Sequence, residues 1–240
     1  MKSRKFVTFL AFFLLPITLN YFSPILIVQG SWEHTFTSMH IIFGLMIICA
    51  MFFGGAWCSH ICPFGAMQDL MPTKKPKQVK DKYRAIKLLT GGIFILLILV
   101  PLWKKGFIKV IIPYHMEDGK ISTSSFKDVM RYYIITGSIA VITLIFGKRS
   151  WCKFVCPMYI FNYNGIKIGS LLKLSSLKIL SHKERCTGCK QCNQHCIMGL
   201  DVALMVKDNK WNKYECTQCG ECLWACSHEV LKRKWKKDNE

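Results

Sequence analysis

The cysteines constrain this chain more than any other residue type, because twelve of the thirteen fall into two repeated patterns. Eight lie near the C-terminal end in two runs of the form C-x2-C-x2-C-x3-C. The first run is Cys186, Cys189, Cys192 and Cys196, and the second is Cys216, Cys219, Cys222 and Cys226. Four more lie in WCSHICP at 57–63 and WCKFVCP at 151–157, each directly after a long apolar stretch. Cys49 is the remaining one, and a lone thiol among apolar side chains is usually a packing residue.

The two C-terminal runs have the spacing of bacterial two-cluster ferredoxins, in which the fourth cysteine of each run binds the other cluster. Three thiolates on one tight loop bind three irons of a [4Fe-4S] cubane, so the fourth iron needs a ligand from elsewhere. The predicted ligand sets are Cys186, Cys189, Cys192 and Cys226 for one cluster, and Cys216, Cys219, Cys222 and Cys196 for the other. Gly188 and Gly220 suit the tight turns that such loops need.

Zinc and disulfides are the alternatives for these eight cysteines. Structural zinc sites are usually built from paired C-x2-C or C-x2-4-C knuckles and not from four cysteines in one run. Disulfides are disfavoured because the region is expected on the reducing side of a membrane. Ile197 and Ser227 stand where a proline often follows the fourth cysteine, but that residue is not a ligand.

The repeated WCxxxCP motif places two thiols four residues apart and follows them with proline. Proline suits the first position of a helix, so Cys62 and Cys156 are predicted to cap helices that begin at Pro63 and Pro157. Unpaired amides at such a position favour a thiolate. Phe53-Gly54 precedes the first copy and Phe146-Gly147 the second, so the repeat extends beyond the motif.

If the two copies converge, Cys58, Cys62, Cys152 and Cys156 have the right number of thiolates for a third iron–sulfur cluster. Three alternatives remain open from the residues alone: two independent disulfides, a copper or zinc thiolate site, and a redox-active dithiol. His60 lies inside the first motif and is a candidate for a hydrogen bond to this site.

The chain is 51% hydrophobic and yet carries a formal net charge of +19, so apolar and basic residues must be segregated. Four stretches have a length and composition that suit a bilayer span, at about 6–29, 38–57, 86–103 and 132–147. The predicted fold is an all-α polytopic membrane domain, with four transmembrane helices in two pseudo-twofold-related hairpins, and a small α+β two-cluster ferredoxin domain.

Orientation follows from the basic residues, since Lys and Arg near span ends are retained on the cytoplasmic side. Lys2, Arg4 and Lys5 precede the first stretch, and further Lys and Arg residues lie between 74 and 87. The predicted location is the bacterial cytoplasmic (inner) membrane, multi-pass, with both termini cytoplasmic. Membrane lipid is the expected partner of the positive charge. Nucleic acid is not expected, because no recognition helix or aromatic RNA-binding signature is present.

The domain organisation predicted from these features has four parts. They are a membrane domain at 1–157, an interfacial amphipathic linker at 158–180, a ferredoxin domain at 181–230 and a basic tail at 231–240. The tail is a candidate docking site for an acidic flavodoxin or ferredoxin in the cytoplasm. His40 lies alone in the second apolar stretch, where a packing role competes with a place in a quinone site.

The combination of WCSHICP, WCKFVCP and a C-terminal two-cluster ferredoxin resembles the NapH-type membrane ferredoxins, whose wider relatives include the membrane part of NosR and the CcoG-like copper reductases. The resemblance implies an electron-transfer subunit of an oxidoreductase, such as a quinol dehydrogenase component. It would relay electrons between quinone or a cytoplasmic donor and an extracytoplasmic flavoprotein or reductase. The alternatives are a copper reductase like CcoG and a redox-sensing accessory protein.

Overall fold

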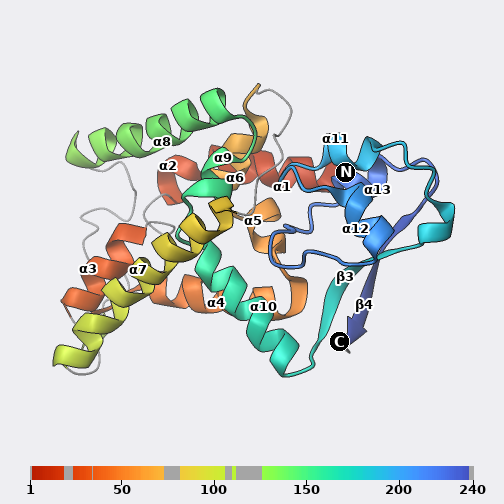
Figure 1. Cartoon of the computed structure of the whole chain (residues 1–240). Helices are drawn as coiled ribbons and strands as arrows, with labels where there is room; N and C mark the ends of the chain where they lie inside the picture. Colours follow the sequence, from red (N-terminus) through yellow and green to blue (C-terminus); the bar gives the residue numbers. More distant parts are fainter. Residues whose placement is uncertain are drawn as a thin grey trace.

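A computed structural model describes residues 2–18, 24–33, 35–72, 82–105, 110–111 and 126–237. Figure 1 shows a helical part on one side, with α7 and α8 at its outer edge, and a C-terminal part with α11, α12 and α13 on the other. The short helices α5, α6 and α9 lie between the two parts. His34 and His115, which the sequence offers as companions of His40 in a quinone site, fall outside the described residues, as does most of the basic segment after residue 73.

The helical part begins with three segments in place of one long helix. These are α1 (Lys2–Phe13), α2 (Leu15–Thr18) and α3 (Pro24–Trp32). The next helices are α4 (Ser38–Phe53), α5 (Ala56–His60), α6 (Pro63–Leu70), α7 (Lys82–Lys105), α8 (Phe126–Phe146), α9 (Ser150–Phe154) and α10 (Tyr159–Leu171). The two-residue strands β1 (Thr35–Phe36) and β2 (Val110–Ile111) pair in parallel.

The prediction of four membrane-spanning helices is wrong. Among the described residues, α8 alone contains a stretch that is long and apolar enough to cross a membrane, Val129–Phe146. The first expected span is divided, with Pro16 in the first turn of α2 and Pro24 at the start of α3, because proline fits a first turn but not a helix interior. The predicted multi-pass topology and the two predicted membrane hairpins both required four spans. The described residues therefore do not support either prediction.

The second and third expected spans are too short. Helix α4 has 16 residues, a length of about 24 Å against a hydrocarbon core of about 30 Å. It ends because Gly54 adopts a φ of 60°, which a helix does not allow. In α7 the apolar stretch Ile86–Pro101 is likewise shorter than a span.

The two copies of the motif have the same local backbone. Helix α5 and helix α9 each have five residues, with the tryptophan of the motif at the second position. In both copies the second cysteine donates its backbone N–H to that tryptophan's carbonyl, Cys62 to Trp57 and Cys156 to Trp151, at 3.0 Å. The repeat in the sequence is therefore a repeat in structure.

The C-terminal part is built on a sheet that joins distant segments. Strand β3 (Ser175–Ser181) pairs antiparallel with β4 (Leu231–Lys237), with Ser181 opposite Leu231. Between them lie α11 (Gln191–His195), α12 (Val202–Asp208) and α13 (Glu221–Trp224). The expected linker 158–180 thus forms α10 and most of β3, and the expected basic tail forms β4 as far as residue 237. A core of apolar side chains holds this part together, including Ile179, Ile197, Val202, Val206, Val230 and Leu231.

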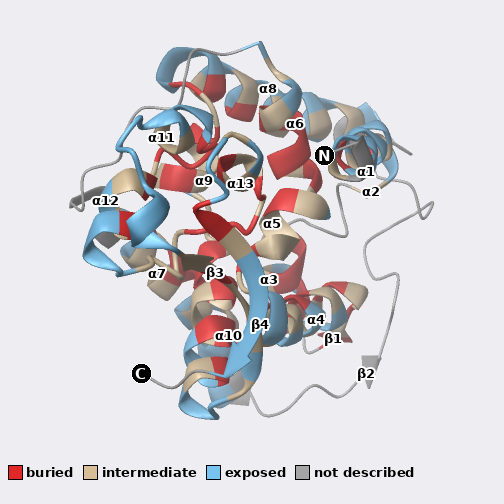
Figure 2. Cartoon of the chain, turned by 90° about the vertical axis from the view of Figure 1, so that its right-hand side faces the viewer, coloured by how far each residue is buried: buried red, intermediate tan, exposed pale blue. Residues whose placement is uncertain are grey.

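Helix α10 crosses α4 at small residues. A Cβ atom on Gly165 would lie 2.6 Å from the Ile47 carbonyl oxygen and 2.7 Å from the Ala50 Cβ. One turn later, a Cβ on Gly169 would lie 2.8 Å from the Met51 carbonyl oxygen. This close approach fixes α10, which follows the second motif, against the helix that precedes the first motif. Figure 2 shows buried residues at α6 and α9 in the middle of the molecule and along part of α10.

Replacing Gly165 with Ala should therefore destabilise the protein by about 1–3 kcal/mol, the usual cost of overpacking. The matched control is Gly92→Ala on α7, where a new Cβ meets nothing within 4 Å. The control should be neutral or stabilising by up to about 1 kcal/mol, because Ala has the higher helix propensity. Thermal unfolding followed by circular dichroism measures both, and equal melting temperatures for the two variants would contradict the packing described.

Candidate metal centres

Three cavities collect the twelve patterned cysteines into groups of four. One small cavity is lined by Cys186, Cys189, Cys192 and Cys226. A second is lined by Cys196, Cys216, Cys219 and Cys222. A third, of about 310 Å³, is lined by Cys58, Cys62, Cys152 and Cys156. Each group has the membership that the spacing predicts for one cluster, and each contains a cysteine from a separate segment of the chain.

The ferredoxin-type loops have a repeated backbone. Gly188 and Lys190 in the first run have φ values of 74° and 58°, and Gln218 and Gly220 in the second have 53° and 83°. In each run, the residues two and four positions after the first cysteine therefore adopt left-handed conformations. The tight turns predicted at Gly188 and Gly220 are confirmed. Those at Lys190 and Gln218 were missed, because only glycine signals such a conformation in a sequence.

The first motif ends as the proline predicts. Cys62 is the N-cap of α6, with Pro63 at the first helical position. Backbone N–H groups of Gly65 and Phe64 interact with the Cys62 thiol and lower its pKa, against the larger effect of burial. In the second motif the helix begins at Tyr159. The helix start predicted at Pro157 is therefore wrong by two residues.

The third cavity is walled by apolar side chains, including Phe43, Met46, Trp57, Ile139 and Trp151. Burial raises the pKa of Cys58 to about 12 and that of Cys62 to about 11, and the neighbouring Cys152 thiol raises both. Such thiols ionise at neutral pH only when a cation or a metal centre binds the sulfur, since metal ligation requires the thiolate. The donor set and its environment therefore fit a metal centre.

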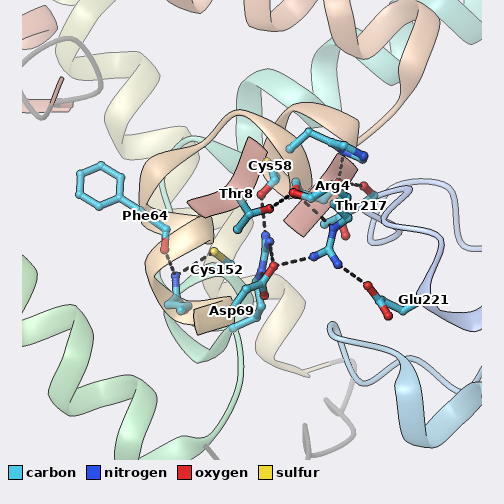
Figure 3. Close-up of polar contacts among 12 residues, drawn as sticks. Arg4, Thr8, Cys58, Phe64, Asp69, Cys152, Thr217 and Glu221 are labelled. Atoms are coloured by element: carbon cyan, nitrogen blue, oxygen red, sulfur yellow. Dashed lines mark hydrogen bonds and ion pairs between the residues drawn. The ribbon is translucent and has the colours of Figure 1, made fainter. Parts of the chain in front are cut away.

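A buried ion network lies beside this cavity (Figure 3). Arg149, which has no exposed surface, donates Nε and Nη2 to the two oxygens of Asp69 at 2.8 and 2.6 Å. Its Nη1 donates to the Cys58 carbonyl at 2.6 Å. Asp69 also accepts from Arg4 at 2.6 Å, and Arg4 donates in turn to Glu221 on α13. The guanidinium of Arg149 lowers the pKa of the Cys58 and Cys62 thiols, partly offsetting their burial.

The loop of the second ferredoxin run is docked on the first motif. Ser59 donates to the Thr217 carbonyl at 2.6 Å. A Cβ on Gly55 would lie 2.6 Å from the Cys216 carbonyl oxygen, so only glycine allows this approach. Lys87, buried in α7, lies 2.5 Å from Glu215 and 3.9 Å from the centre of the Tyr159 ring. Cys216 consequently lines both its own cavity and the cavity of the motif cysteines.

The two histidines have different surroundings. His40 caps α4, where its Nδ1 accepts from the Thr37 backbone N–H at 3.2 Å and its ring stacks on Phe36 at 5.1 Å. His60 lies on a groove lined also by Cys219 and Cys226, and it is not among the residues around the third cavity. His60 therefore lies near two ferredoxin cysteines. Within the part of the chain that the structure describes, none of the contacts of His40 is with a cysteine.

Each of the three cavities is lined by four of the patterned cysteines. Within the described residues, no three His, Cys, Asp or Glu side chains come together as ligands of a single ion. In a four-iron cubane each iron takes one thiolate, so four sulfurs spread around a cavity match that donor arrangement. The class of protein that the fold and these sites define is an iron–sulfur protein with a ferredoxin-type C-terminal part.

Comparison with known families agrees with that class. A 4Fe-4S binding domain family matches residues 35–76 and 130–165, which contain the two CxxxCP motifs. A 4Fe-4S dicluster domain family matches residues 178–227. These matches confirm the predicted 4Fe-4S chemistry and the ferredoxin domain. The assignment of each cysteine to a cluster remains a prediction, as does the number of clusters.

The chain is similar to several curated proteins, and it spans about half the length of the first of them. It is 21% identical over 210 residues to the "Putative electron transport protein YccM" of Escherichia coli, covering 83% of this chain and 56% of YccM. It is 24% identical over 213 residues to the regulatory protein NosR of Stutzerimonas stutzeri, covering 82% of this chain and 27% of NosR. An uncharacterised protein of Methanocaldococcus jannaschii, MJ0749, is 26% identical over 191 residues, covering 78% of this chain and 67% of that protein. No solved structure matches the chain.

The network around Asp69 should be essential for stability. Asp69→Asn leaves Arg149 buried without its charge partner, and breaking a buried pair costs about 3–5 kcal/mol. The control is Glu229→Gln, which removes an exposed partner that lies 3.9 Å from Lys232 and should cost less than about 1 kcal/mol. Denaturant unfolding of both variants checks the difference, and a cost for Asp69→Asn no larger than the control's would refute the role of the network.

Proposed function

We propose that the chain is a membrane-associated electron-transfer protein in which a third iron–sulfur site connects to two ferredoxin clusters. The ligands of the third site would be Cys58, Cys62, Cys152 and Cys156. The observation that carries the proposal is the shared wall: Cys216 borders both the motif cavity and the second ferredoxin cavity. Centres held in two cavities that share a lining residue would be neighbours, as electron transfer between them requires.

The residues around the third cavity fit an iron–sulfur cluster, and each has a role in binding it or controlling its surroundings. Iron–sulfur clusters supply one-electron transfer at potentials set by charge, hydrogen bonds and solvent exposure. The apolar wall of Phe43, Trp57 and Trp151 excludes water from the third site. Arg149 holds a fixed positive charge beside it, and Ser59 and Gly55 keep the Cys216 loop against the motif.

The soluble end of this path would be the first ferredoxin cavity. Cys186 and Cys189 are exposed, whereas Cys216 and Cys222 are buried. Strand β4 beside this part carries exposed basic side chains, among them Arg233, Lys234 and Lys236. Complementary charge mainly raises the rate of encounter, so an acidic cytoplasmic ferredoxin or flavodoxin is the proposed soluble partner.

Lipid contact is proposed from apolar side chains that the fold leaves exposed. On α1, α7 and α8 these include Phe9 at 57%, Leu89 at 64% and Ile134 at 63% exposure, and only 11% of the apolar stretch of α8 is buried. Exposed apolar surface of this extent marks a membrane or protein contact. The adjoining positive charge favours anionic lipid of the bacterial cytoplasmic membrane.

The membrane-side partner follows from the lining of the third cavity. This lining includes Ile42, Ile135 and Ile139, and an apolar lining of this kind suits exchange with a membrane quinone. We further propose a NapH-type role, in which electrons pass between the quinone pool or a cytoplasmic donor and an extracytoplasmic flavoprotein or reductase. The homology to YccM and NosR supports this role.

Iron analysis tests the proposal. The full-length protein, purified anaerobically, should contain about 12 iron atoms per chain for three cubanes, against about 8 for two. The double variant Cys62→Ala/Cys156→Ala should lose about 4 of them together with one species in the EPR spectrum of the reduced protein. Cys49→Ala, outside all three cavities, is the control and should lose none. A wild-type content of about 8, or copper bound at the motif cysteines, would contradict the third site.

A further inference from the structure

The sequence repeat around the third site is longer than the cysteine motif. Counting five residues on from the proline of each copy reaches a side-chain amide, Gln68 after Pro63 and Asn162 after Pro157. Both amides are almost fully buried, with 0% and 3% exposure. Buried amides at equal positions in two copies are a second pair of matched residues beside the cysteines.

Each amide reaches across to the first cysteine of the other copy. Asn162 Nδ2 donates to the Cys58 Sγ at 2.7 Å, and Gln68 Nε2 lies 3.2 Å from the Cys152 Sγ. Gln68 Nε2 also donates to the Phe64 carbonyl at 3.0 Å, which fixes the amide in this orientation. Figure 3 marks the contacts at Phe64 and at Cys152 with dashed lines. The crossing follows from packing, since α10 lies on α4 and α6 lies on α8.

The amide oxygens show that the donors are the useful ends of these side chains. Within the described residues, neither Gln68 Oε1 nor Asn162 Oδ1 has a hydrogen-bond partner. A buried polar atom without a partner costs free energy. A leucine or methionine would fill the same space without that cost, so what distinguishes the amides here is their N–H groups directed at sulfur.

We propose that Gln68 and Asn162 are positioning residues that set the reduction potential of the third site by donating hydrogen bonds to Cys152 and Cys58. This inference rests on the proposed third site. When one electron passes from the neighbouring ferredoxin centre to the site, the negative charge on its sulfurs increases and no proton is required. N–H donors stabilise that added charge, so they raise the potential. Their symmetric placement gives one donor to each copy of the motif.

The test uses the full-length protein purified anaerobically, with a redox titration followed by EPR. Asn162→Leu and Gln68→Met keep the volume and remove the donor. Each should lower the midpoint of the third-site signal by roughly tenfold in the one-electron equilibrium, or about 59 mV, and the double variant should approach the sum. Iron content and the two ferredoxin midpoints should not change.

Gln29→Leu is the matched control, because Gln29 is an exposed amide on α3 that lines none of the three cysteine cavities. A third-site midpoint that stays at the wild-type value in Asn162→Leu and Gln68→Met would overturn the inference while the proposed function stood. A wild-type protein with about 8 iron atoms and no third signal would overturn the proposed function itself.

A second test uses the wild-type protein, so it remains decisive if the variants fail to assemble the third site. Protein labelled with 15N in the side-chain amides of glutamine and asparagine should show a 15N coupling in pulsed EPR of the third-site signal. Backbone nitrogens carry no label, so the coupling reports these side chains alone. No coupling at that signal would overturn the inference.

Discussion

The contact between Arg149 and Asp69 is the interaction on which the rest of the structure depends. Arg149 precedes the second motif, Asp69 follows the first, and the same guanidinium binds the Cys58 carbonyl. Through Arg4 the network continues to Glu221 of the ferredoxin part. A fully buried ion pair adds little net stability, because desolvation offsets attraction. Its value here is registry: the two motifs and the ferredoxin unit come together in one arrangement because an alternative leaves a charge unpaired.

That registry explains how a sequence repeat becomes a site. The two local backbones are alike at Trp57 and Trp151, so each copy presents two thiols in the same way. The helix that follows each motif packs on the helix that precedes the other motif, α10 on α4 and α6 on α8. Gly165 and Gly169 allow α10 to approach α4 closely. Four sulfurs meet in an apolar cavity that also touches Cys216. The cavity is lined by buried thiols beside the charge of Arg149, and it shares Cys216 with the second ferredoxin cavity.

Much of the site could be predicted from the sequence, because cysteine spacing encodes ligand geometry directly. The turns at Gly188 and Gly220 and the cap at Cys62 follow from local rules. The three groups of four cysteines follow from the spacing and the repeat of the motifs. The four membrane spans could not be predicted correctly, because mean hydropathy does not register that a helix begins at Pro24 or that one ends before Gly54. Lys190 and Gln218 adopt left-handed conformations that side-chain type does not announce. Gln68 and Asn162 were missed although their equal spacing from two prolines was a visible signal.

The central claim is that sulfurs from two separate motifs surround one inorganic centre next to the ferredoxin. Anomalous scattering at the iron absorption edge, from crystals of the anaerobically purified protein, tests it most directly. The account predicts three iron peaks, one of them among Cys58, Cys62, Cys152 and Cys156 and adjacent to the peak held by Cys216. Two peaks confined to the ferredoxin part, with the motif cysteines free or joined as disulfides, would contradict it.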